Sequence, residues 1–132
     1  MVWLFAYPCV RLYRGRVVNQ NLLYGILCFI ACHVFAWFGN SLQFVSEWWR
    51  DRPILTILLF SMPIGFSAYY GMRFTYEGMG TLWSARFVGY ATSFFIFPVL
   101  TWWFLHESMF TAKTLACIAL SLVILWVQIT WK

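Results

Sequence analysis

The stretch CFIACHVFAWFGNSLQF, from Cys28 to Phe44, decides the fold. It lies within an apolar run long enough to cross a bilayer, which requires about 20 residues. The run nevertheless carries His33, Asn40 and Gln43, which fall with Trp37 near one stripe of a helix at about 3.6 residues per turn. Because a polar stripe is costly against hydrocarbon, we expect it to face protein or a water-filled cavity.

The composition of the whole chain indicates an integral membrane protein. The 132 residues suit one domain, and 63% are hydrophobic while only 10% are charged. A soluble domain usually has about 25% charged residues, so this chain lacks the polar surface needed to face water on all sides. The net charge of +5 comes from basic residues at the ends of the apolar segments. That placement is typical of membrane topology signals rather than of nucleic-acid binding.

The apolar segments predict an all-α integral membrane fold with four transmembrane helices, at residues 22–44, 53–72, 81–105 and 110–129. Pro53 suits the first turn of the second helix, and Ser108 or Thr111 suits the cap of the fourth. A loop is predicted after Met72, with Gly78 and Gly80 as helix breakers. Residues 21–132 then form one four-helix transmembrane domain.

The first 20 residues are predicted to form a separate N-terminal segment that lies in the membrane interface. Their apolar run of about ten residues is too short to span a bilayer. No basic residue precedes that run, so it does not read as a signal peptide. Trp3, Tyr7 and Tyr13 beside three arginines are typical of an interfacial position.

The basic and aromatic residues predict the orientation. With four spans, six of the nine basic residues fall on the side of the two termini and three on the other. The positive-inside rule therefore places both termini in the cytoplasm, and we expect the cell (inner) membrane. Tryptophan and tyrosine mark the two interfaces, with one group on each side: Trp48, Trp49, Trp102 and Trp103, and Tyr70, Tyr76, Trp83 and Trp131.

Two stretches carry a resemblance to a known family. The end of the chain, FPVLTWWFLHESMFTAKTLACIALSLVILWVQ, resembles the C-terminal helix pair of the drug/metabolite transporter (DMT) superfamily, with Glu107 in the short turn. In the first helix, FAWFGNSLQF is similar to a small uncharacterised branch with a Phe-Ala-Trp-aromatic-Gly core. The resemblance covers residues 20–130. It implies a DMT-like four-helix transporter that works as a homodimer.

The sequence departs from that superfamily at two places. The small multidrug-resistance branch carries a membrane-embedded Glu in its first helix, near the place where this chain has His33. No predicted span has an interior carboxylate, so we expect transport without Glu-based proton coupling. The glycines usual in the last helix are also absent, and Cys117, Ala119 and Ser121 stand in that region.

The candidate solute path consists of six residues, and each has a purely structural alternative. His33 carries a proton or forms a hydrogen bond to a neighbouring helix. Asn40 and Gln43 bind a solute or pack near the loop, and Trp37 lines an aromatic pocket or packs. Arg86 shares a helix stripe with Tyr90 and Ser93, and it contacts an anion or snorkels to the interface. The six residues are His33, Trp37, Asn40, Gln43, Arg86 and Tyr90.

Small residues predict where helices approach one another. In membranes, small side chains let two helix backbones pack closely. Such tracks occur on the second and fourth predicted helices, at Ser61 and Gly65 and at Ala112, Ala116 and Ala119.

The cysteines do not indicate a metal site or a disulfide framework. Cys28 and Cys32 share one helix face, but His33 points about 100° away from it and no carboxylate accompanies them. We therefore expect no metal and no cofactor.

These observations favour a small transporter that moves an unidentified solute across the lipid bilayer, with His33 and Arg86 favouring a neutral or anionic one. The alternative is a non-transporting accessory or structural subunit that binds a larger membrane partner through the small-residue tracks. An enzyme is disfavoured, because the sequence lacks a paired acid/base or metal-binding constellation.

Overall fold

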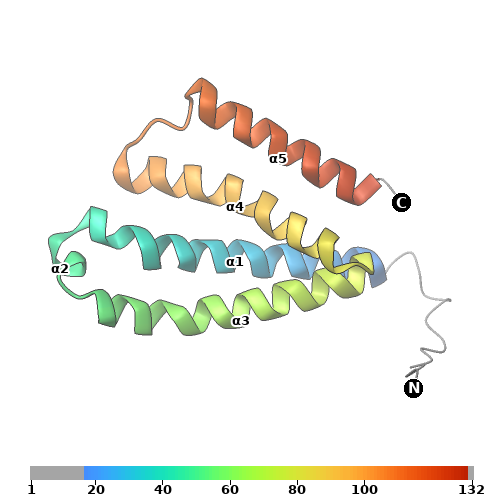
Figure 1. Cartoon of the computed structure of the whole chain (residues 1–132), viewed down its shortest axis with the longest axis horizontal. Helices are drawn as coiled ribbons and strands as arrows, with labels where there is room; N and C mark the ends of the chain where they lie inside the picture. Colours follow the sequence, from blue (N-terminus) through green and yellow to red (C-terminus); the bar gives the residue numbers. More distant parts are fainter. Residues whose placement is uncertain (1–16, 131–132) are drawn as a thin grey trace, which may run out of the picture.

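The computed structural model describes residues 17–130, which form helices joined by short connections (Figure 1). The helices are α1 (Val17–Val45), α2 (Glu47–Arg50), α3 (Pro53–Met79), α4 (Leu82–Leu105) and α5 (Ala112–Thr130). The predicted interfacial segment lies outside the described residues up to residue 16. Residues 17–20, which were assigned to that segment, belong to α1.

Four of these helices are long and apolar enough to cross a membrane: α1 from Gln20, α3, α4 and α5. The prediction of an all-α protein with four membrane-spanning helices is confirmed at this level. The start of α1 and the end of α5 lie at the same end of the molecule (Figure 1).

The prediction that a loop begins after Met72 was wrong. α3 continues for two further turns and ends at Met79, with Gly80 in the left-handed conformation at φ 78°. Arg73 donates to Glu77 one turn later over 3.0 Å, and such pairs at i and i+4 stabilise a helix. Gly78 is accommodated inside the helix, so Gly80 alone acts as the terminator.

The other helix ends follow local chemistry. Pro53 stands in the first turn of α3, as predicted, where its missing N–H has no partner to lose. The Thr81 hydroxyl accepts from the Ser84 N–H and caps α4, and Thr111 accepts from the Thr114 N–H and caps α5. His106 ends α4 in the left-handed region, at φ 55°.

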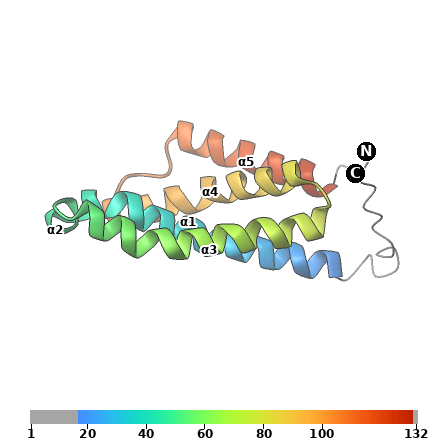
Figure 2. The ribbon, with the colours of Figure 1, turned by 60° about the horizontal axis from the view of Figure 1, so that its bottom comes forward.

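The four long helices pack against one another to different extents. α1 and α3 pack together along their length, and α4 lies between this pair and α5 (Figures 1 and 2). α5 packs against α4, and most of its shielded residues form a stripe spaced by three and four residues: Thr114, Ile118, Ser121, Leu125 and Gln128. The remaining faces of α5 are exposed and apolar, as a lipid-facing surface requires.

Three helices pack closely around Phe29. Its buried ring lies where α1, α3 and α4 meet, against Gly71 on one side and Gly89 on the other. A Cβ atom added at Gly71 would lie 2.9 Å from Phe29 Cδ1, and one at Gly89 would lie 3.1 Å from Phe29 Cε1. The two glycines therefore provide the space for the ring and set the depth at which His33, one turn later, meets α4.

Candidate functional site

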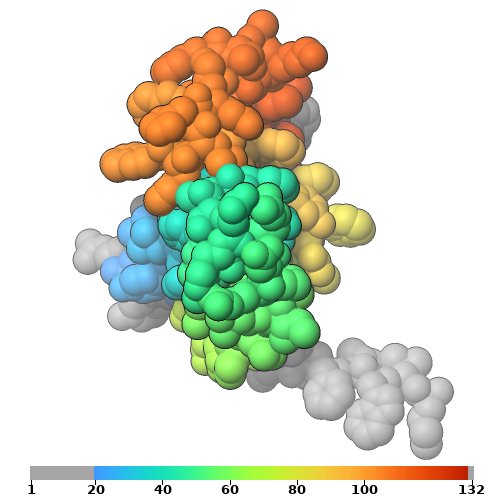
Figure 3. All heavy atoms as spheres, turned by 90° about the vertical axis from the view of Figure 1, so that its left-hand side faces the viewer, coloured from blue at the N-terminus to red at the C-terminus, as the bar shows by residue number. Residues whose placement is uncertain are grey.

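A cavity of about 580 Å³ lies beside α4, between His33 of α1 and the start of α5. Figure 3 views the molecule from the α2 end and shows the α4–α5 connection and the start of α5 beside the end of α1. The lining residues come from α1, α4, the α4–α5 connection and α5: His33, Ser93, Phe94, Phe97, Pro98, Thr101, Glu107, Ser108, Met109 and Thr114. Its volume matches a pocket for a small molecule.

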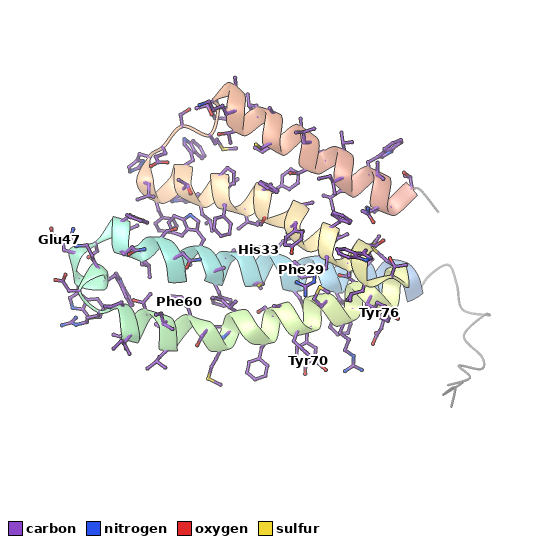
Figure 4. All side chains as sticks on the ribbon, in the orientation of Figure 1. Phe29, His33, Glu47, Phe60, Tyr70 and Tyr76 are labelled. Carbon is purple, nitrogen blue, oxygen red and sulfur yellow. The ribbon has the colours of Figure 1, made fainter. Side chains whose placement is uncertain are left out.

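His33 is the contribution of α1 to this cavity, and it lies midway along that helix (Figure 4). Its Nε2 atom lies 2.8 Å from the carbonyl oxygen of Gly89 on α4. A backbone carbonyl only accepts, so Nε2 carries the hydrogen and donates it. The hydrogen bond to a neighbouring helix, which was the structural alternative for this residue, is therefore present, and the half-buried ring also lines the cavity.

Trp37 lies one turn beyond His33 and is fully buried. Its Nε1–H donates to the Thr101 hydroxyl oxygen over 2.9 Å, and its ring packs 5.1 Å from that of Phe104. Trp37 does not line the cavity itself. It positions Thr101, which does.

The hydroxyl groups of the cavity wall already have partners within the protein. The Ser93 hydroxyl donates to the Tyr90 carbonyl over 2.6 Å, and Ser108 Oγ accepts from the Phe110 N–H over 3.3 Å. Thr114 shares a hydrogen bond of 2.8 Å with Thr111. Each of these oxygens keeps capacity for one further bond toward the cavity.

The other residues of the predicted path lie away from this cavity. Asn40 and Gln43 are exposed near the end of α1, where the Gln43 amide donates to the Asn40 carbonyl over 2.8 Å. Arg86 and Tyr90 are exposed on α4, nearer to the other end of the molecule. The structure thus brings His33 and Trp37 together at α4, but of the six predicted residues His33 alone lines the cavity.

Sequence reasoning missed most of the cavity wall. The stripe of Arg86, Tyr90 and Ser93 continues at the same spacing through Phe97 to Thr101, so extending it by two turns would have found these residues. Glu107, Ser108 and Met109 carry no such signal, because their approach to His33 depends on how the α4–α5 connection folds back.

The predicted helix-packing residues lie on exposed faces of the chain. Nothing lies within 4 Å of a Cβ atom added at Gly65, which borders a shallow hollow on α3 together with Ser61. The three alanines of α5 are exposed on the side opposite the stripe that meets α4: Ala112, Ala116 and Ala119. Within residues 17–130, no other helix covers these tracks.

Among residues 20–130, no group of three potential metal-binding side chains occurs. Cys28, Cys32 and Cys117 are free thiols. Besides His33, Glu107 is the one ionisable residue of the described chain that lines the cavity. Neither Arg86 nor Lys113 lines it.

Comparison with known proteins found no matching family model, no matching curated protein and no matching solved structure. The DMT resemblance therefore stays a prediction from the sequence.

Proposed function

We propose that this chain is a small membrane transporter that moves a small solute through the cavity beside His33. The observation that carries the proposal is the cavity itself: a hollow of about 580 Å³ lined by hydroxyls, an imidazole and a carboxylate, in a bundle of membrane-spanning helices. Intramembrane polar groups are costly unless they serve packing or a solute path. Here the hydroxyls and the imidazole keep unused bonding capacity toward the cavity.

The proposed transporter works as a homodimer. In one chain α5 is covered only along its α4-facing stripe, and the cavity is bounded by helices on only part of its circumference. A second copy completes the wall on the open side of the cavity, and the small-residue tracks of α3 and α5 allow close contact between the helices of the two copies. This arrangement agrees with the DMT-like plan expected from the sequence, and it uses no carboxylate in the middle of a span.

The alternative function is an accessory subunit that binds a larger membrane partner. The exposed tracks at Ser61 and Gly65, and at the three alanines of α5, favour it, because small residues on a lipid-facing surface suit close helix contact. Under this alternative the cavity is a packing gap that the partner fills.

Uptake by liposomes that contain the purified chain separates the two functions. A transporter accumulates at least one member of a broad panel of small neutral, cationic and anionic solutes faster than protein-free liposomes do. An accessory subunit gives no uptake with any solute and co-purifies with one stoichiometric membrane partner.

A further inference from the structure

The hydrogen bond between His33 and Gly89 determines which nitrogen of the imidazole is free. Because the Gly89 carbonyl accepts from Nε2, the neutral ring carries its hydrogen on Nε2 and leaves Nδ1 as an acceptor with a lone pair. No described residue forms a hydrogen bond with Nδ1, although the ring is half-buried and lines the cavity. Nδ1 is therefore available to a hydrogen-bond donor that enters the cavity beside His33.

Two other groups of the cavity wall have the same preference. Glu107 contributes a carboxylate, which accepts and carries a negative charge, and Ser93 has already used its hydroxyl hydrogen on the Tyr90 carbonyl. Ser108 and Thr101 accept within the protein and keep a hydroxyl hydrogen, but among the described residues no Lys or Arg lines the cavity to bind an anion. Phe94, Phe97 and Met109 supply an apolar wall between these polar groups.

We propose that the cavity binds a small amphipathic solute through its hydrogen-bond donors, with a hydroxyl or amino group of the solute donating to Nδ1 of His33. The proposal rests on the proposed function, which makes this cavity the solute site. It gives the solute class as alcohols and amines with an apolar body. Carboxylates and phosphates are disfavoured, because they carry negative charge and would face Glu107 without a counter-ion among the described residues. From His33 and Arg86 the sequence predicted a neutral or anionic solute. Because Arg86 lies outside the cavity, the proposed solute class is instead neutral alcohols and amines.

A proton and the solute exclude each other at Nδ1. Protonation of His33 places the second hydrogen on Nδ1, whereas the Nε2–H bond to Gly89 is the same in both charge states. Solute binding is therefore present above the pKa of His33 and is lost as the pH falls through it. Within the described chain, Glu107 is the other titratable group that lines the cavity, and Arg86 and Tyr90 of α4 are exposed outside it.

The test uses the full chain in lipid nanodiscs, labelled with ¹⁵N in its histidine rings. NMR distinguishes a ring nitrogen that carries hydrogen from one that does not, and His106 in the exposed α4–α5 connection is the internal control. Three probes with one carbon skeleton are titrated: 2-phenylethanol, 2-phenylethylamine and phenylacetate. We expect a hydrogen on Nε2 of neutral His33. We also expect a saturable shift of Nδ1 with the alcohol and the amine, at least tenfold weaker binding of phenylacetate, and no shift at His106.

Three results would overturn the proposal: a neutral His33 with its hydrogen on Nδ1, phenylacetate binding as tightly as the amine, or saturable probe binding that leaves both His33 nitrogens unchanged. Two variants sharpen the test. His33→Gln keeps a donor for Gly89 and an acceptor that does not protonate, so the alcohol should bind with an affinity independent of pH. His33→Phe has neither group and should weaken binding at least tenfold.

The experiments can contradict the transport function and the solute site at His33 independently of each other. Binding at Nδ1 without uptake into liposomes contradicts the transport function and leaves the site intact. Uptake that is unchanged in both His33 variants contradicts the site and leaves transport intact.

Discussion

At the scale of single residues, the bundle depends on glycines that meet large side chains. Phe29 occupies the space that Gly71 and Gly89 leave free, and its depth sets where His33 reaches the Gly89 carbonyl. A close-packed interior accommodates an added methyl group only by moving its neighbours. The site geometry is thus coupled to the packing one helical turn away.

Gly71→Ala should lower the free energy of unfolding by about 1–3 kcal/mol, because its Cβ atom would lie 2.9 Å from the Phe29 ring. Gly65→Ala on the same helix is the matched control. Nothing lies within 4 Å of a Cβ atom there, so loss of glycine's backbone freedom should raise stability by about 0.5–1 kcal/mol. Reversible unfolding in mixed micelles measures both. Equal effects of the two substitutions would show that Phe29 does not pack against Gly71.

The residues also show what a sequence can and cannot predict. The polar stripe of α1 was visible from spacing alone, and His33 and Trp37 do face α4. Their partners were not visible, because a backbone carbonyl such as that of Gly89 has no signature in the sequence. Glu107 reaches the cavity through the path of a short connection, which residue types do not specify.

At the scale of elements, the predicted helix positions agree with the structure to within a few residues for α4 and α5, since long apolar runs between polar turns leave little choice. The end of α3 was predicted too early, because Gly78 was interpreted as a helix breaker. The pair formed by Arg73 and Glu77 and the tertiary packing of α3 on α1 outweigh that glycine's propensity.

The capping of α5 provides a test at this scale. Thr111→Ala should lower the free energy of unfolding by about 1 kcal/mol, because the Thr114 N–H then loses its 3.2 Å hydrogen bond to the Thr111 hydroxyl. Ser108→Ala is the control, since Ser108 accepts only from Phe110 in the connection before the helix. Hydrogen exchange of the first-turn amides of α5 reports the loss directly. If Ser108→Ala exposes these amides more than Thr111→Ala does, Thr111 is not the cap.

At the scale of the whole molecule, the two ends of the described chain lie at the same end of the bundle, whose four long helices are apolar enough to cross a membrane. The excess of basic residues expected on that side predicts that it faces the cytoplasm. A reporter fused after Lys132 should therefore be active only in its cytoplasmic form, and a reporter inserted in α2 only in its external form. Activity of both forms at one position would indicate insertion in two orientations.

The central claim is that solute passes through the cavity beside His33, and uptake with the cavity blocked tests it most directly. Ser93→Leu fills the cavity wall, whereas Cys117→Leu adds similar bulk on the exposed part of α5 outside it. The account expects liposomes with the wild-type chain or Cys117→Leu to accumulate 2-phenylethylamine several-fold faster than protein-free liposomes, and Ser93→Leu to abolish that difference. Equal uptake by the folded Ser93→Leu and wild-type proteins would contradict it.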